Sequence, residues 1–144
     1  MDGIDRLFGG LHVSASALKA ERTRIDVIAQ NIANAQTTRM PGTDEPYRRQ
    51  VGHFAPILER ARNGGFGPSG VRVSKVVGDQ ATPFESVHDP SHPHANAQGI
   101  VNFPNVNVTR EMADLMTAVR SYEASLSVQE SFLQMVERSL RLAE

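Results

Sequence analysis

The chain of 144 residues contains no cysteine and no tryptophan, and aromatic residues make up only 6% of it. Without cysteine there are no disulfide bonds, no zinc sites built on thiolates and no cysteine nucleophile. Few aromatic side chains imply a modest hydrophobic core, because these residues supply much of the buried area in ordinary domains. The composition therefore fits one small domain, or a small domain that carries helical arms.

Signals for membrane insertion and secretion are also missing. No stretch approaches the roughly 18 consecutive apolar residues of a transmembrane helix, and the first residues do not form a basic and then apolar secretory signal. The net charge of −1 and the pI of about 6.5 argue against binding to nucleic acid or to anionic membranes. On these grounds alone we expect a cytoplasmic location, unless export follows a route without such a signal.

Near both ends of the chain, large apolar residues recur at every seventh position, and this repeat predicts two long helices. On each helix these residues form an apolar line along one side, which we call the seam. In the first helix, residues 4–35, the seam positions are Ile4, Leu7, Leu11, Leu18, Ile25, Ile28, Ile32 and Ala35. In the second helix, residues 110–143, they are Met112, Leu115, Val119, Tyr122, Leu126, Leu133, Val136, Leu140 and Ala143. Each helix would be about 50 Å long, which is longer than a small domain covers from within. Such helices suggest a subunit of an assembly.

The ends of these helices have recognisable signals. Asn34 can close the first helix in the left-handed conformation. The second helix should begin at an N-cap formed by Asn107 or Thr109, with Glu111 in the first turn, where a negative charge is favourable. Polar residues interrupt the seams at Ser14, Glu21 and Gln129, which weakens a simple two-stranded coiled coil.

Between the helices, residues 39–107 contain clusters of proline and glycine and favour short strands and turns. We predict strands at 47–51, 53–58, 70–77, 84–87 and 100–103, of which 70–77 shows the clearest alternation of apolar and polar residues. Residues 63–68 should form a turn or loop. Residues 89–94 should form a turn, because two prolines block regular pairing. The region is expected to be an irregular β-rich insertion.

The sequence gives little support for catalysis or metal binding. His88, His92 and His94 raise the question of a metal site, but the neighbouring prolines favour a turn in which the imidazoles do not converge. No Gly-x-Ser-x-Gly motif is present, and the glycines at 64, 65 and 67 lack the spacing and the lysine of a phosphate-binding loop. We therefore expect neither catalysis nor a metal nor any other cofactor.

Several short motifs occur together in a specific order. The run Asn31-Ile32-Ala33-Asn34-Ala35, followed by Thr37-Thr38, resembles the N-terminal signature of bacterial flagellar rod and hook proteins, the axial family. Later motifs keep the spacing seen in rod members of that family: Tyr47-Arg48-Arg49, His88-Asp89-Pro90, Pro104-Asn105-Val106, Glu111-Met112 and Arg120-Ser121-Tyr122-Glu123-Ala124. The match covers nearly the whole chain.

The resemblance implies a structural subunit of the proximal rod. The expected fold is mainly α, with two long terminal helices in an antiparallel, coiled-coil-like hairpin and a β-rich insertion between them. Residues 1–38 and 108–144 would form the rod core, and residues 39–107 would lie further out. The resemblance also implies a place in the periplasm, reached through the flagellar type III export apparatus without a cleaved signal. Implied partners are copies of the chain, proximal rod proteins B and F, distal rod protein G and the protein that joins the rod to the MS ring.

For the assembly we make three predictions. The seam positions, except Ala35 and Ala143, carry the contacts between subunits. Asn31 and Asn34 make backbone or inter-subunit hydrogen bonds at the helix end. The terminal helices become ordered only when neighbouring subunits cover their seams. The alternative from the residues alone is a cytoplasmic helical hairpin that recruits one partner through its β insertion.

Overall fold

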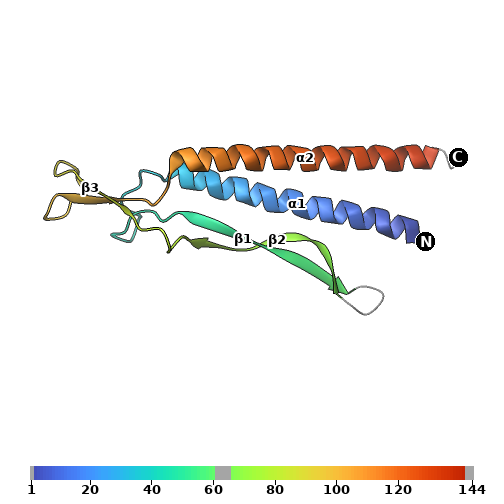
Figure 1. Cartoon of the computed structure of the whole chain (residues 1–144), viewed down its shortest axis with the longest axis horizontal. Helices are drawn as coiled ribbons and strands as arrows, with labels where there is room; N and C mark the ends of the chain where they lie inside the picture. The colour runs from blue at the N-terminus through green and yellow to red at the C-terminus, as the bar shows by residue number, and fades with distance from the viewer. Residues whose placement is uncertain (1, 61–65, 142–144) are drawn as a thin grey trace.

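The computed structural model describes residues 2–60 and 66–141, and within these ranges the side chains of residues 2–8, 60, 66, 68 and 140 are outside the description. The elements are α1 (Asp2–Ala33), β1 (Gln50–Arg60), β2 (Phe66–Gly78), β3 (Glu85–His88), β4 (Ile100–Phe103) and α2 (Val108–Arg141). The two long helices lie side by side and run in opposite directions (Figure 1). The prediction of a mainly α fold with two long terminal helices and a β insertion is confirmed.

The structure has three layers, and α1 is the middle one. α2 lies on one side of α1, and the hairpin of β1 and β2 lies on the other (Figure 1). β3 and β4 form a separate two-stranded sheet beyond the end of the helices (Figure 1). The sequence did not predict that the first hairpin runs back along α1. This packing covers a further part of α1 within a single chain, beyond the side that α2 covers, where we had expected neighbouring subunits.

Two of the predicted strands, 47–51 and 53–58, are in fact the single strand β1, which begins at Gln50. The residues before it are excluded from the sheet because their backbone groups bond elsewhere. The amide of Tyr47 donates to Thr37 O at 2.9 Å, and the amide of Arg49 donates to Asn105 Oδ1 at 2.8 Å. The other three predicted strands correspond to β2, β3 and β4. Residues 63–65 of the predicted 63–68 turn are outside the described ranges, and β2 already begins at Phe66.

The ends of the helices follow the predictions only in part. α1 ends at Ala33, and the described residues with positive φ are all glycines, so the predicted left-handed Asn34 is wrong. Asn34 Nδ2 instead donates to Gln30 O at 2.9 Å, and Asn34 Oδ1 accepts from the Thr37 hydroxyl at 3.2 Å. Such local bonds between side chain and backbone can close a helix end without a left-handed residue. At α2, Asn107 Oδ1 accepts from the Arg110 amide at 3.0 Å, which confirms one of the two predicted caps.

The contact between the helices includes only part of the predicted seam of α2. Ala118 is completely buried and Phe132 is half-buried beside Gly10, whereas the seam residue Leu133 is exposed. A seven-residue repeat drifts by about 20° per heptad on a straight helix, so a strict seam does not stay on one partner. The large aliphatic side chains of α2 therefore flank the contact with α1.

Candidate functional site

Buried polar side chains from several segments meet near the end of α1. Asn31 is only 1% exposed, and its side-chain amide uses all of its hydrogen-bonding positions. Asn31 Nδ2 donates to Gln50 O at 2.9 Å and to Glu111 Oε2 at 3.0 Å. Asn31 Oδ1 accepts from the Tyr47 hydroxyl at 2.9 Å and from the Gln50 amide at 2.8 Å. One side chain thus joins α1, the connection before β1, β1 itself and α2.

The carboxylate of Glu111 is also buried, and Arg49 neutralises it. Arg49 Nε lies 2.7 Å from Glu111 Oε1, while Asn31 donates to the other carboxylate oxygen. Arg49 Nη1 also lies 3.8 Å from Asp79 Oδ2. A buried carboxylate is tolerated when its oxygens have donors and its charge has a partner. Removing either partner would therefore leave a desolvated charge.

Asn105 extends this cluster to the segment that follows β2. Its Oδ1 accepts from the Arg49 amide, and its Nδ2 donates to Asp79 O at 3.1 Å and to Thr82 O at 2.9 Å. We call Asn31, Tyr47, Arg49, Asn105 and Glu111 the polar junction. It holds both helices, the start of β1 and the 79–82 turn in one arrangement.

The surroundings of the polar junction shift two pKa values. Burial, and secondly the negative charge of Glu111, raise the pKa of Tyr47 above its ordinary value of 10.0. The hydrogen bond from the Thr82 hydroxyl is the main cause that lowers the pKa of Asp79. Each shift favours the form that makes the observed bonds, a neutral tyrosine and an ionised aspartate. Because Asn31 is saturated from within the chain, we interpret the junction as an organiser of the fold.

The predicted assembly residues fall into three groups. Buried within the chain are Ile28 and Asn31. Half-buried are Leu11, Leu18, Ile25, Ile32, Asn34, Leu115, Val119, Tyr122 and Val136. Met112, Leu126 and Leu133 are exposed by 55%, 36% and 51%. The side chains of Ile4, Leu7 and Leu140 are outside the described part.

Sequence reasoning missed most of the polar junction. Glu111 was assigned to the helix dipole, and Tyr47 and Arg49 to a strand. The available signal was the resemblance itself, because Tyr47, Arg49, Asn105 and Glu111 all belong to the motifs that carry it. Nothing local in the sequence predicts that these motifs meet in space.

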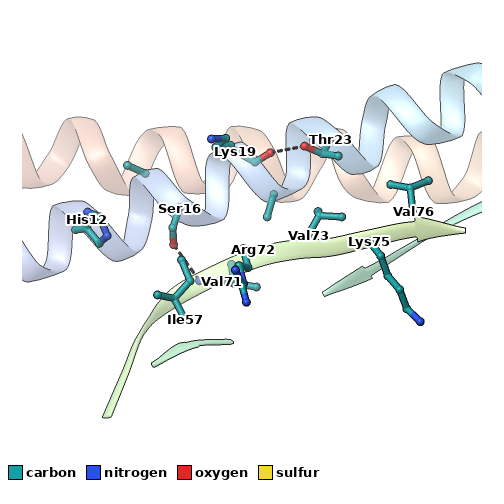
Figure 2. A pocket seen from close by; sticks show the side chains of 12 residues that line it. His12, Ser16, Lys19, Thr23, Ile57, Val71, Arg72, Val73, Lys75 and Val76 are labelled. Atoms are coloured by element: carbon teal, nitrogen blue, oxygen red, sulfur yellow. Dashed lines mark hydrogen bonds between the residues drawn. The ribbon is translucent and has the colours of Figure 1, made fainter. Parts of the chain in front are cut away.

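A groove lies between α1 and β2 (Figure 2). At one end of it, Ser16 Oγ donates to Val13 O at 2.7 Å and accepts from the Val71 amide at 3.0 Å, which fastens the helix to the strand. Elsewhere, His94 Nδ1 bonds the Thr38 hydroxyl at 2.7 Å. The described residues include no group of three or more His, Asp or Glu side chains arranged to hold a metal ion. Among the described helices, none has the length and apolar character needed to cross a membrane.

Comparisons with known proteins agree with the resemblance. Residues 11–39 match the family model "Flagella basal body rod protein", and residues 97–142 match "Flagellar basal body rod FlgEFG protein C-terminal". The flagellar basal-body rod protein FlgC of Bacillus subtilis is 40% identical over 95% of this chain and 98% of its own length. The FlgC proteins of Borreliella burgdorferi and Salmonella typhimurium are 38% and 36% identical, over 96% and 92% of this chain and 98% and 94% of their own lengths.

These relatives are structural rod proteins, and they match nearly the whole of both chains. The two family models cover α1 from residue 11 onward and the whole of α2, and these parts include Asn31 and Glu111 of the polar junction. The chain therefore belongs to the FlgC family of flagellar basal-body rod proteins.

Proposed function

We propose that this chain is a structural subunit of the rod of the bacterial flagellum and that it assembles through its two terminal helices. The rod is a hollow shaft, so each subunit must contact neighbours on more than one side. Torque would be carried by many small apolar contacts spread along about 50 Å of helix. In this arrangement no active site is required.

The observation that carries this proposal is the exposure of part of the seam on α2. Within one chain, α1 covers Ala118 and leaves Met112, Leu126 and Leu133 outside the contact. Exposed large apolar side chains repeated along one helix mark a surface that another protein covers. Since the relatives are rod proteins, the covering surface in our proposal belongs to neighbouring subunits, either copies of this chain or other rod proteins.

A single substitution on this surface tests the proposal. Leu126→Asp should abolish motility and incorporation into purified basal bodies, because it places a charge in an apolar contact between subunits. Ser127→Asp is the matched control, since it introduces the same charge at the adjacent exposed position. We expect the control to stay motile and both variants to accumulate to the level of the unmodified chain. A motile Leu126→Asp strain would contradict the proposal.

The location and export of the chain belong to the same proposal. We place the chain in the periplasmic part of the basal body, exported by the flagellum's own apparatus, with residues 1–38 and 108–144 in the rod core and residues 39–107 further from its axis. Cell fractionation of a strain that lacks this apparatus tests the route. The chain should then stay in the cytoplasm. Its appearance in the periplasm of that strain would contradict this route.

A further inference from the structure

Exposed apolar side chains lie on two opposite sides of α2. The first set belongs to the predicted seam and comprises Met112, Leu126 and Leu133. The second set comprises Val128 and Met135, which are exposed by 63% and 57%. Since each helical residue advances by about 100°, the two sets lie about 140–180° apart around α2. We call them the seam side and the reverse side, and one neighbouring helix cannot cover both.

Two grooves show where these sides of α2 lie relative to α1. Leu133 lines one groove together with Ala15 of α1. Asp114 lines the other groove together with Arg24 of α1 and Phe54 of β1. Ala15 and Arg24 are nine residues apart, which places them about 180° apart around α1. The seam side therefore lies on one side of the helix pair, and the reverse side, about 40–60° around α2 from Asp114, lies on the other.

The outer edge of the seam side is acidic. Three exposed glutamates lie within about 60° of Leu126 around the helix, namely Glu123, Glu130 and Glu137. Arg141 forms an ion pair with Glu137. Among the described residues, no ion pair involves Glu123 or Glu130. This edge therefore carries an excess of negative charge.

The outer edge of the reverse side is basic. Arg120 and Arg138 are both exposed, and each lies about 80° around the helix from Val128 and about 120° from Leu126. The ion pairs within the described part of the chain include neither arginine. The two sides of one helix thus carry opposite charge at their outer edges. Such complementarity favours the approach of two copies side by side.

The seam side and the reverse side also match in their spacing along the helix. Val128 follows Leu126 by two residues, and Met135 follows Leu133 by two residues. Two parallel copies of α2 that are shifted by two residues, about 3 Å, therefore bring both seam residues of one copy level with both reverse-side residues of the other.

The same shift brings the charged edges together. Glu137 of one copy then lies about 2 Å along the axis from Arg138 of the other, and Glu123 lies about 8 Å from Arg120. Side chains of this length cover such axial distances by extending along the helix surface. Apolar and charged groups therefore match in a single arrangement.

We propose that the seam side of α2 in one chain packs against the reverse side of α2 in a second copy, with the two helices parallel. This inference rests on the proposed function, because a rod subunit has copies of itself as neighbours. The two sides are different surfaces of the chain, so the contact is heterologous. Such a contact adds copies side by side, as the wall of a hollow shaft requires, and does not close into a two-fold dimer.

Cysteine cross-linking tests this packing directly, because the chain has no cysteine of its own. One tagged form carries Leu126→Cys, and a second form with a different tag carries Val128→Cys. Basal bodies that contain both forms should give a covalent dimer with one copy of each tag after treatment with a short thiol cross-linker. Leu133→Cys with Met135→Cys should give the same product. Ser127→Cys in place of Val128→Cys is the matched control, since Ser127 is exposed and lies about 100° around the helix from both sides.

Pairs of identical positions distinguish this packing from a symmetric dimer. Leu126→Cys in both tagged forms should give at most about a tenth of the product of the mixed pair, because two seam sides do not meet in a heterologous contact. Equal yields would show a two-fold contact and overturn the proposal. So would a Ser127→Cys control that links as well as Val128→Cys.

Two sets of substitutions give an independent readout. Val128→Asp should abolish motility and incorporation into basal bodies, although Val128 is mostly exposed within one chain. Arg120→Glu with Arg138→Glu should reduce the covalent dimer and motility, and so should Glu123→Lys with Glu137→Lys. The chain that carries all four charge changes should recover both. The packing is wrong if a Val128→Asp strain is motile, or if the fourfold variant is no better than either double variant.

The two proposals fail in different ways. If the unmodified chain is absent from purified basal bodies, or if a Leu126→Asp strain is motile, the proposed function itself is wrong. If the chain is present and Leu126→Asp abolishes motility, but neither cysteine pair gives the covalent dimer, only the packing between copies is wrong.

Discussion

At the scale of single residues, the structure depends on a few atoms that connect distant parts of the chain. Asn31 and Glu111 are 80 positions apart, yet their side chains bond at 3.0 Å in a buried site. Tyr47 supports this contact by donating to Asn31 Oδ1 at 2.9 Å. Each buried partner that is removed leaves an unsatisfied polar atom, which costs about 1–3 kcal/mol.

Tyr47 should make the stability of the chain depend on alkaline pH. Its pKa in the folded chain is raised above 10.0, so the unfolded chain loses this proton first. The stability that depends on the neutral hydroxyl is fully present below about pH 10 and declines as the pH rises through the folded pKa. Tyr47→Phe should remove this part of the decline and cost about 1 kcal/mol at neutral pH, because the bond to Asn31 is lost.

Urea unfolding between neutral pH and pH 10.5 (about half a unit above the ordinary tyrosine value) measures both effects. Tyr122→Phe is the control, since Tyr122 is the other tyrosine of the chain and lies outside the polar junction. If the free energy of unfolding falls at alkaline pH by the same amount in Tyr47→Phe as in the unmodified chain, another group causes this fall.

At the scale of elements, the attachment of the β1–β2 hairpin to α1 depends on close approach at Gly70. A Cβ at this position would overlap Ser16 Oγ, and the backbone φ of +150° also disfavours other residues. Ser16 accepts the Val71 amide at the same place. The absence of a side chain at Gly70 therefore lets the strand reach the helix.

Gly70→Ala should loosen the hairpin from α1 and destabilise the chain by roughly 1–3 kcal/mol through strain and the lost bond. Gly67→Ala in the same strand is the control, because a Cβ there would meet no atom within 4 Å. Chemical denaturation compares the two variants. Equal stability of Gly70→Ala and Gly67→Ala would contradict the close contact.

At the scale of the whole molecule, the three layers are not equally well joined. Near the polar junction, the helices share buried residues such as Val27, Ile28 and Ala118. Further along, the side of α2 that faces α1 presents Ser125 and Gln129, which are polar and only half-buried. Because burial of apolar area is the main stabilising contribution, the helix pair should open more readily far from the junction.

Hydrogen exchange on the isolated chain should therefore be graded along the helices. Backbone amides at 24–31 and 111–118 should exchange slowly, and amides at 11–18 and 125–136 should exchange faster. Incorporation into the rod should remove the gradient, since neighbouring subunits would then cover the exposed seam. Uniform protection of both helices in a dilute monomer would contradict this expectation, and with it our prediction that assembly orders the terminal helices.

Local sequence patterns predicted the helices and strands well, but they predicted poorly how these elements pack together. The repeat of aliphatic residues predicted both helices, and the alternation at 70–77 predicted β2, because each signal acts between residues close in the sequence. Asn34 was wrongly expected to be left-handed, since its side chain found partners at Gln30 and Thr37. The polar junction was missed because its bonds join residues 16 to 80 positions apart, and no periodicity encodes such distances.

The order of amino acids was enough to predict two long helices around a β-rich insertion, a helix cap at Asn107 or Thr109 and the motifs of a rod protein. Folding in three dimensions settled which face each helix presents. α1 became the central layer because the β1–β2 hairpin turned back onto it, and on α2 the fully buried position is the small Ala118, beside the aliphatic seam. Part of the seam on α2 therefore stays exposed: periodicity makes a helix amphipathic, but only packing selects the partner of its apolar side.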